Sequence, residues 1–419
     1  ICYGFSTTLT AVGSGGTPTY TYAWSNGVNT ASQTVSPTAT TTYTVTVTDS
    51  KGCTKTDAVT VTVNPLPSVD AGADVEICYG FSTTLTAIGS GGTPTYTYLW
   101  SNGATTASTS VSPTVTTTYT VTVTDSKGCT KTDAVTVTVN PLPSVDAGAD
   151  VEICYGFSTT LTAVGSGGTP TYTYAWSNGV NTASQTVSPT ATTTYTVTVT
   201  DSKGCTKTDA VVVTVNPLPN VDAGADVEIC YGFSTTLTAI GSGGTPGYTY
   251  AWSNGATTAS TSVSPTVTTT YTVTVTDSKG CTKTDAVVVT VNPLPSVDAG
   301  ADVEICYGFS TTLTAVGSGG TPTYTYAWSN GVNTASQTVS PTATTTYTVT
   351  VTDSKGCTKT DAVVVTVNPL PNVNAGPDVE ICYGFSTTLT AVGSGGTPGY
   401  TYAWSNGVNT ASQTVSPTA

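Results

Sequence analysis

Short runs of strictly alternating apolar and polar residues recur along the whole chain. Residues 118–124 read Thr-Tyr-Thr-Val-Thr-Val-Thr, and residues 134–139 read Ala-Val-Thr-Val-Thr-Val. This period of two is typical of β-strands that bury one face. Residues 125–128, Asp-Ser-Lys-Gly, lie between the two runs and have the composition of a hairpin turn. The two runs therefore predict an antiparallel hairpin.

Shorter runs upstream of this hairpin predict further strands, and no stretch has the period of a helix. Glycine and proline separate the runs, above all in Gly-Ser-Gly-Gly-Thr-Pro at residues 89–94. About seven short strands in so few residues predict an all-β fold, an Ig-like β-sandwich. The further strands are expected at residues 73–78, 82–87, 96–101 and around 108–112.

The pattern returns every 76 residues with almost no change. Ile-Cys-Tyr-Gly-Phe at residues 1–5 recurs at Ile77, Ile153, Ile229, Ile305 and Ile381. A period of this length is that of a small domain. We expect a tandem array in an elongated rod, cut from a longer protein. Its domains are predicted at residues 1–65 (partial), 66–141, 142–217, 218–293, 294–369 and 370–419 (partial).

Composition excludes several classes of function. The net charge is −14, and the sequence contains neither histidine nor arginine. Such a chain could not replace the counterions of nucleic acid phosphates, and no apolar run is long enough to span a bilayer. Without a histidine base, an arginine clamp or a nucleophile with a recognisable partner, the repeats do not have the features of an enzyme. We therefore expect no catalytic residues.

Tryptophan recurs once per repeat, in the middle strand. Tryptophan at this place in a sandwich is expected to pack into the core. Tyr96 and Tyr98, beside the glycine-rich segment, are the candidates for a carbohydrate-binding or surface-binding face, although packing of the loop is the more ordinary role for them. The predicted core tryptophans are Trp24, Trp100, Trp176, Trp252, Trp328 and Trp404.

Cysteines alternate at spacings of 51 and 25 residues, without a Cys-x-x-Cys pair or a histidine. Disulfides, and hence an oxidising compartment, are the expected state. Cys78 should lie at the end of the first strand, and Cys129 should lie at the opposite end of the domain, after the hairpin. Bonds between neighbouring repeats are therefore favoured, with bonds inside each repeat, Cys78 to Cys129, as the alternative. The neighbour scheme predicts Cys2–Cys129, Cys78–Cys205, Cys154–Cys281 and Cys230–Cys357.

Acidic residues gather around the predicted junctions, where Asn-Pro-Leu-Pro at residues 140–143 predicts a stiff, extended linker. Carboxylate oxygens suit Ca²⁺, so calcium is a candidate cofactor, although none is required and the sequence has no Asp-x-Asp-x-Asp-Gly loop. Solvated surface residues and turn caps are the alternative. The candidate ligands are Asp70, Asp74, Glu76 and Asp125, and, one repeat later, Asp146, Asp150, Glu152 and Asp201.

Gly-Gly-Thr-Pro-Thr-Tyr-Thr-Tyr-Leu-Trp-Ser-Asn-Gly at residues 91–103, followed by Tyr-Thr-Val-Thr-Val-Thr-Asp at 119–125 and Gly-Cys at 128–129, resembles a known family. It is similar to the tandem Ig-like and PKD-like repeats of large Bacteroidota cell-surface adhesins, including the SprB-type adhesins of gliding motility. The resemblance extends over every repeat. It implies an extracellular, cell-surface protein exported by type IX secretion.

Two classes of function follow. The first is a non-catalytic stalk or filament segment of a very long secreted adhesin, stiffened by disulfides. The second is a multivalent module that binds carbohydrates or surfaces, or a subunit of a multi-chain extracellular fibre. In either case the expected partners are further copies of the repeat, with other chains, surfaces or glycans as additional candidates. Neither nucleic acid nor membrane insertion is expected.

Overall fold

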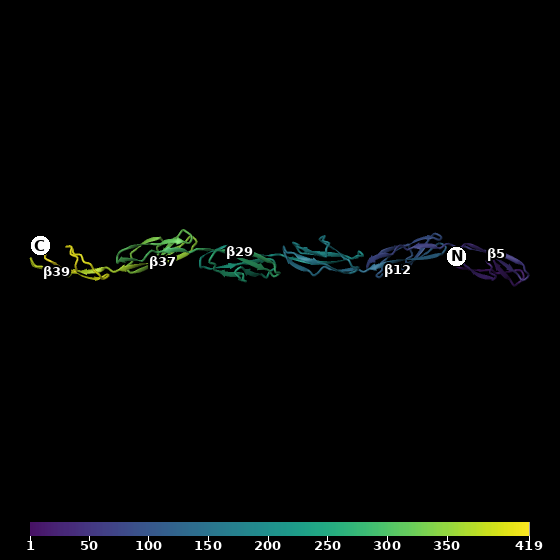
Figure 1. The fold of residues 1–419 in the computed structure, drawn as a ribbon, viewed down its shortest axis with the longest axis horizontal. Coiled ribbons are helices and arrows are strands. Elements are labelled where there is room, and N and C mark those ends of the chain that lie inside the picture. The colour runs from purple at the N-terminus through teal and green to yellow at the C-terminus, as the bar shows by residue number, and fades with distance from the viewer. Residues whose placement is uncertain (419) are drawn as a thin grey trace. The chain divides into compact units, whose positions relative to one another are not determined.

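The computed structural model describes residues 1–418. The described chain consists of β-strands joined by turns and loops, without helices (Figure 1). Accordingly, the described part has no helix that could cross a membrane. The chain divides into two compact units, Ile1–Val215 and Asn216–Ala419, and each contains successive copies of the repeat.

The second repeat, in the first unit, shows the complete set of eight strands. Alternating threonine and valine form its two longest strands, as the pattern predicts. The strands are β6 (Pro67–Asp70), β7 (Val75–Cys78), β8 (Thr83–Thr86), β9 (Ile88–Gly91), β10 (Thr97–Trp100), β11 (Ser108–Val111), β12 (Thr117–Thr124) and β13 (Thr130–Asn140).

These strands form one four-stranded sheet and two strand pairs. The sheet has the order β10-β12-β13-β7, while β8 pairs with β11 and β6 pairs with β9. All pairings are antiparallel except that of β7 with β13, which is parallel and places Cys78 opposite Asn140. The register of the hairpin places Thr118 opposite Thr136, and their hydroxyl oxygens lie 3.1 Å apart on the outer face.

The core lies between the four-stranded sheet and the strand pairs. Val121 and Val137 from the sheet are fully buried, and Leu85 packs against them from the other layer. Trp100 is 1% exposed, and its indole N–H donates to the Thr106 carbonyl at 3.1 Å. Burying each aliphatic side chain stabilises the fold by about 1.5–3 kcal/mol. The predicted all-β Ig-like sandwich is confirmed.

The glycine-rich segment differs from its prediction as a loop, because part of it is strand β9. Gly89 permits this, since a Cβ there would lie 3.1 Å from the Tyr96 ring. Gly92 has a φ of +59°, and a Cβ there would lie 2.7 Å from Asp125 Oδ2 and 2.9 Å from Pro67 N. The segment is thus glycine-rich because ring, carboxylate and backbone approach it closely.

The same elements recur in the other repeats. The first unit also contains β1 (Thr7–Thr10), β2 (Thr21–Trp24), β3 (Ser32–Val35), β4 (Thr41–Thr48), β5 (Thr54–Val61), β14 (Pro143–Asp146), β15 (Val151–Cys154), β16 (Thr159–Thr162), β17 (Val164–Gly167), β18 (Thr173–Trp176), β19 (Ser184–Val187), β20 (Thr193–Thr200) and β21 (Thr206–Asn216).

The second unit begins with the fourth repeat and continues through the fifth. Its strands are β22 (Pro219–Asp222), β23 (Val227–Cys230), β24 (Thr235–Thr238), β25 (Ile240–Gly243), β26 (Thr249–Trp252), β27 (Ser260–Val263), β28 (Thr269–Thr276), β29 (Thr282–Asn292), β30 (Pro295–Asp298), β31 (Val303–Cys306), β32 (Thr311–Thr314), β33 (Val316–Gly319), β34 (Thr325–Trp328), β35 (Ser336–Val339), β36 (Thr345–Thr352) and β37 (Thr358–Asn368).

The last repeat contributes fewer strands, and its tryptophan is less buried. Trp404 is half-buried, because the counterpart of β12, which covers Trp100 in the second repeat, would follow residue 419. The other predicted core tryptophans, Trp24, Trp176, Trp252 and Trp328, are buried like Trp100. The strands of the last repeat are β38 (Pro371–Asn374), β39 (Thr387–Thr390), β40 (Val392–Gly395) and β41 (Ser412–Val415).

Candidate functional site: the junctions between repeats

Disulfides join neighbouring repeats within the first unit. Cys2 of the first repeat bonds to Cys129 of the second, and Cys78 of the second bonds to Cys205 of the third. In both bonds the Cα atoms lie 5.6 Å apart and the sequence separation is 127 residues. These are pairs of the neighbour scheme, and Cys78 is not joined to Cys129 of its own repeat.

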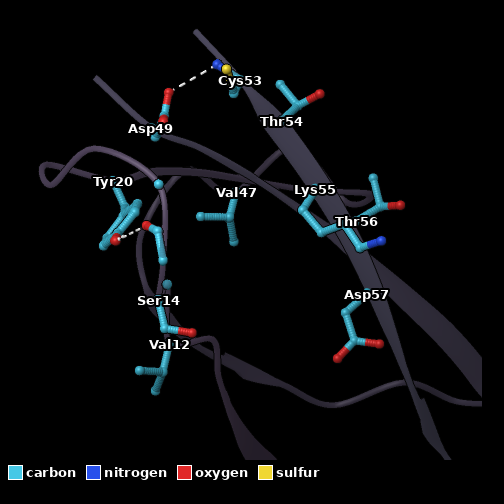
Figure 2. Close-up of a pocket in the computed structure, with 13 residues that line it drawn as sticks. Val12, Ser14, Tyr20, Val47, Asp49, Cys53, Thr54, Lys55, Thr56 and Asp57 are labelled. Atoms are coloured by element: carbon cyan, nitrogen blue, oxygen red, sulfur yellow. Dashed lines mark hydrogen bonds between the residues drawn. The ribbon is translucent and has the colours of Figure 1, made fainter. Parts of the chain in front are cut away.

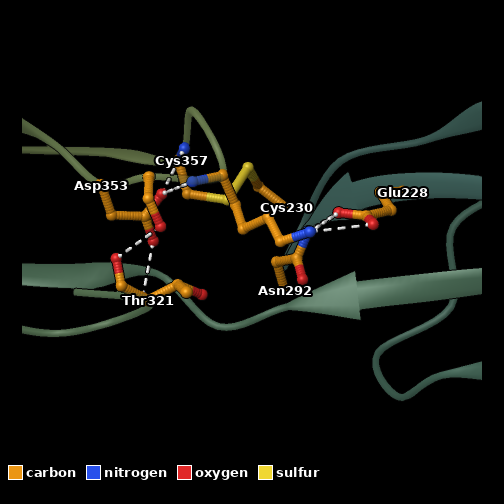
Figure 3. The surroundings of a disulfide bond; sticks show 8 residues. Glu228, Cys230, Asn292, Thr321, Asp353 and Cys357 are labelled. Atoms are coloured by element: carbon orange, nitrogen blue, oxygen red, sulfur yellow. Dashed lines mark hydrogen bonds and ion pairs between the residues drawn. A yellow bond between two sulfur atoms is a disulfide. The ribbon is translucent and has the colours of Figure 1, made fainter. Parts of the chain in front are cut away.

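The second unit contains the same connection. Cys230 of the fourth repeat bonds to Cys357 of the fifth, again across 127 residues (Figure 3). Cys154 and Cys281 are also disulfide-bonded. Among the described residues, the free cysteines are Cys53, Cys306 and Cys382. For each of these three, the partner position required by the neighbour scheme lies outside the 419 residues.

A polar network accompanies the disulfide at the junction. Lys203 Nζ, from the hairpin of the third repeat, lies 2.8 Å and 2.9 Å from the two carboxylate oxygens of Glu76 in β7. The Asn140 amide donates to the same carboxylate at 2.9 Å, and the Tyr79 N–H donates to the Asn140 carbonyl at 2.8 Å. Because Lys203 and Glu76 are about half exposed, the ion pair adds orientation more than stability.

The same network recurs in the second unit with different residue numbers. Lys355 Nζ lies 2.8 Å from Glu228, and the Asn292 amide donates to Glu228 at 3.1 Å beside the Cys230–Cys357 bond (Figure 3). From the second repeat onward, only two residues, a proline and a leucine, separate the last strand of one repeat from the first strand of the next. The junction therefore combines a short linker, a disulfide and a polar network.

A buried aspartate fixes the hairpin that carries the second cysteine. Asp125 Oδ1 accepts hydrogen bonds from the Lys127 and Cys129 N–H groups, both at 2.9 Å, and Oδ2 accepts one from Thr93 N–H at 2.9 Å. The Cys129 side chain is 1% exposed and the hairpin is closed by Gly128, whose φ is +79°. The hydrogen bonds to Asp125 thus fix the position of Cys129 within its own hairpin.

Hydrogen bonding lowers the pKa of several carboxyl groups at these positions. The Thr93 N–H, followed by those of Cys129 and Lys127, holds the pKa of Asp125 below its ordinary value. The Ala71 N–H, a bond of 2.8 Å, lowers the pKa of Asp133. The Lys203 ammonium and then the Asn140 amide lower the pKa of Glu76. Each of these bonds favours the ionised carboxylate.

We expect the stability of the chain to be steady at neutral pH and to fall on acidification below about pH 4. An unfolded carboxyl titrates near pH 4. A group with a lower folded pKa stabilises the fold fully above that pH and loses its contribution as the pH falls through the folded pKa. Thermal unfolding measured by circular dichroism from neutral pH downwards tests this. Asp125→Asn should weaken the decline, and stability that increased on acidification would contradict the expectation.

The structure does not bring the candidate calcium ligands together. Asp70 and Asp74 accept hydrogen bonds from Gly72 N–H at 2.9 Å and Thr136 N–H at 2.7 Å, while Glu76 binds Lys203. The later set is arranged likewise. Asp146 accepts from Gly148 N–H, Asp150 from Val212 N–H, and Asp201 from the Thr169, Lys203 and Cys205 N–H groups; Glu152 also has a partner.

The strand order explains why spacing along the sequence misplaces these carboxylates. Asp201 lies in the hairpin at one end of its repeat, while Glu152 belongs to β15, which runs toward the other end. Residues 1–418 contain no group of three or more side chains able to hold a metal ion. The carboxylates with the hydrogen bonds given above act as acceptors that fix turns and strand ends, and calcium binding stays a prediction.

The two candidate binding tyrosines are engaged with the glycine-rich segment. The Tyr96 hydroxyl donates to the Gly91 carbonyl at 2.6 Å, and the Tyr98 hydroxyl accepts from Gly89 N–H at 3.2 Å. Tyr98 also packs against the core. Both hydroxyl groups therefore help to hold the glycine-rich segment in place.

A different pair of aromatic residues is exposed in every repeat, and the sequence reasoning did not single it out. Tyr79 is 51% exposed and Phe81 60% exposed, on either side of Gly80, whose φ is +85°. The turn is closed by Phe81 N–H donating to the Cys78 carbonyl at 3.0 Å. We name it the aromatic turn. Its members are Tyr3, Phe5, Tyr79, Phe81, Tyr155, Phe157, Tyr231, Phe233, Tyr307, Phe309, Tyr383 and Phe385.

A signal for the aromatic turn was present in the sequence. Glycine between two aromatic residues directly after a predicted strand indicates a tight turn, and turns lie at the surface. Phe81 is followed by a complete repeat and is 60% exposed. Phe309 is followed by a repeat that lacks the hairpin, and it is 63% exposed, which is nearly the same. The aromatic turn therefore remains accessible whether or not a complete repeat follows.

The first repeat has a groove between its glycine-rich segment and its hairpin (Figure 2). Val47, Asp49 and Cys53 line it, together with Gly16 and Tyr20. In the second repeat the corresponding positions are covered by β6, which pairs with β9 and contacts β12 and β13. A counterpart of β6 would precede residue 1 in the first repeat. The groove thus corresponds to the position that β6 occupies in the second repeat.

Comparison with known families identifies part of the chain directly. The family described as SprB repeat matches residues 76–105 and 228–257, which are equivalent segments of the second and fourth repeats. No curated protein matches the chain. The matched segments contain the aromatic turn, the glycine-rich segment and the core tryptophan.

Solved structures similar to the chain are tandem Ig-domain proteins. Sidekick-1 immunoglobulin domains 1–5 match at 13% identity and a TM-score of 0.23, covering 88% of this chain and 96% of that one. Titin domains I67–I69, in an E-to-A mutated variant, match at 12% identity and a TM-score of 0.31, covering 54% and 98%. The N-terminal eight Ig domains of DSCAM match at 14% identity and a TM-score of 0.21, covering 99% and 79%.

The fold assignment rests on the strand order and core described above. The segments matched by the family recur at 76-residue intervals in all repeats with almost the same sequence. The chain is therefore a tandem array of Ig-like domains that contains segments similar to the SprB repeat, which suggests a repeat region of an adhesin-like protein.

Proposed function

We propose that the chain is a non-catalytic stalk segment of a long, secreted cell-surface adhesin. The observation that carries this proposal is the bond from Cys78 to Cys205, which joins neighbouring repeats. A disulfide inside one domain would stabilise that domain alone, whereas a bond between neighbours restrains the junction. Repeats that are nearly identical and joined in this way suit a role in which length and stiffness matter.

The resemblance to SprB-type adhesins extends the proposal to location and export. Disulfides persist in oxidising compartments, which supports an extracellular setting. We propose export by type IX secretion and a role of the parent protein in gliding motility. The chain itself supplies reach, and it needs no cofactor for that role.

Imaging of the parent protein on cells tests the stalk function. Deleting residues 142–293, two whole repeats, should leave the protein at the cell surface and shorten each thin filament seen by electron cryotomography. Labelling an epitope tag on intact cells checks the surface location. Ordered bundles of filaments would instead favour a subunit of a multi-chain fibre, and a protein retained inside the cell would contradict both functions.

A second function, multivalent binding of polysaccharide, is favoured by the aromatic turns. Two half-exposed rings in each repeat are too small a patch for a stable protein interface, which buries about 800 Å² per partner. They are large enough to stack on the apolar faces of sugar rings, and weak sites on one chain add through avidity. No arginine or histidine lies in the chain, which suits a neutral glycan.

Retention of the full chain on immobilised polysaccharide tests this second function. Replacing the tyrosine and phenylalanine of every aromatic turn with serine should abolish retention. A control in which Val115 and Val267, exposed residues elsewhere on the second and fourth repeats, become serine should leave it unchanged. Equal retention of both variants would contradict binding by the aromatic turns.

A further inference from the structure

The two cysteines of a repeat lie at opposite ends of one parallel strand pair. Cys78 is the last residue of β7, and Cys129 directly precedes the first residue of β13. The two strands run in the same direction, with Val75 opposite Val137 and Cys78 opposite Asn140. A disulfide therefore leaves the end of β7, and another arrives at the beginning of β13.

These connections create two covalent routes through the first unit. One route passes from Cys2 across its bond to Cys129, and then along the chain through β13 to Cys154. The other follows the chain from Cys53 to Cys78 and then crosses the bond to Cys205. Each junction in this unit is thus crossed twice, once by a disulfide and once by the polypeptide.

We propose that the disulfides form two staggered load paths that carry tension through the array and bypass the body of each sandwich. The proposal deepens the stalk function and rests on it for its biological purpose. The body of the second repeat is the segment between Cys78 and Cys129, which contains β8 to β12 and Trp100. Neither route passes through them, so unfolding of the body releases no length.

The segments that do carry tension have little slack. The 25 residues after Cys129, which end at Cys154, contain β13, β14 and β15 with 11, 4 and 4 residues. A strand already rises about 3.3 Å per residue, and a fully extended chain reaches only about 3.3–3.6 Å per residue. The load paths are therefore built from the parts of the fold that are already extended.

Without the disulfides, tension would pass through non-covalent contacts. The chain comes into the second repeat through β6 and β7 and leaves it through β13. The pull would then shear the four-residue parallel ladder between β7 and β13. With the disulfides in place both strands carry tension in the same direction, and this ladder is not sheared.

The second unit has the same elements. Cys230 ends β23, which pairs in parallel with β29, and its bond leads to Cys357 at the beginning of β37. The arrangement is therefore a property of the repeat, since it occurs wherever both cysteines of a bond lie in one unit.

Pulling the full chain by peptide tags at its two ends tests the proposal, because two redundant paths predict a non-additive result. Three oxidised variants are compared with wild type: Cys78→Ser with Cys205→Ser, Cys2→Ser with Cys129→Ser, and all four substitutions together. Cys53→Ser with Cys306→Ser, at unpaired cysteines, is the matched control. Each pair of substitutions removes one bond and leaves no new free thiol.

We expect wild type, the control and each double variant to reach the same maximum extension, because one route remains intact. The quadruple variant should extend further by 127 residues, which is about 440 Å. This limit depends on covalent connectivity, so it holds even for a variant that folds poorly. The proposal is overturned if either double variant extends further than wild type, which is the result that disulfides inside each repeat would give. It is also overturned if the quadruple variant extends no further than wild type.

The extension measurement and the cell experiment can fail independently. A chain that lacks the two load paths could still be a surface stalk, and it would then shorten its filament on deletion of residues 142–293. A chain retained inside the cell would contradict the stalk function without changing the extension of the purified array.

Discussion

Truncation of Trp100 to alanine should destabilise the second repeat by about 3–5 kcal/mol, the usual cost of removing a buried tryptophan. The ring is 1% exposed, lies in the core with Val121 and Val137, and donates a hydrogen bond to Thr106. Its loss would leave a cavity and an unpaired carbonyl. Since small domains are stable by about 5–15 kcal/mol, the repeat should open far more often.

Hydrogen exchange with mass spectrometry of the oxidised full chain measures this effect. Peptides that span residues 95–105 identify the second repeat. In the equivalent segments of the other repeats, Thr95 and Ala104 do not occur together. Leu99→Ala is the matched control, since Leu99 is the neighbouring residue but is 55% exposed, and it should change stability by less than about 0.5 kcal/mol. Equal exchange in both variants would show that Trp100 does not support the core.

The alternating pattern predicts the sandwich well because one residue type forms each face. Threonine and valine alternate in β12 and β13, and the register of the hairpin places Thr118 opposite Thr136 outside and keeps Val121 and Val137 inside. A slip by one residue would expose every valine, so the pattern specifies the pairing. The position of Cys78 and Cys129 at opposite ends follows from the same strand order.

The pattern fails where backbone contacts decide the structure. Strands β6 and β9 pair with each other, although one begins with proline and the other is half glycine. Propensity counts against both segments. Gly89 in β9 lies close to the Tyr96 ring, a contact that the alternating pattern does not indicate.

The partners of the carboxylates and the exposure of the aromatic residues also depend on the tertiary structure, and the sequence pattern does not give them. Sequence spacing places Asp150 and Glu152 near a junction, but it does not give their partners. Asp150 accepts a hydrogen bond from Val212 N–H, whereas Glu76, the equivalent of Glu152 in the second repeat, binds a lysine of the next repeat. Likewise, spacing gives no exposure, so Tyr98 and Tyr79 look alike until the fold packs one against the core and leaves the other half exposed.

Gly92→Ala should destabilise the second repeat by more than about 3 kcal/mol, because it adds a clash to an unfavourable backbone conformation. The φ of +59° alone costs about 1–2 kcal/mol for a residue with a Cβ. The new Cβ would also lie 2.7 Å from Asp125 Oδ2 and 2.9 Å from Pro67 N. Either β6 or the Asp125 hairpin must move, and both hold the junction in place.

Gly103→Ala separates the two contributions, since Gly103 has a φ of +87° but no atom within 4 Å of the position that a Cβ would occupy. In a domain of this size, 1 kcal/mol shifts the melting temperature by about 4–8 °C. Calorimetry of the full chain should therefore show the second repeat of Gly92→Ala melting about 12 °C or more below the other repeats. Gly103→Ala should shift by only about 4–16 °C if the backbone conformation acts alone. The melting temperature of Gly92→Ala could instead fall no further than that of Gly103→Ala. In that case β6 would accommodate the methyl group without cost, and the close approach at Gly92 would not fix the hairpin that carries the disulfide.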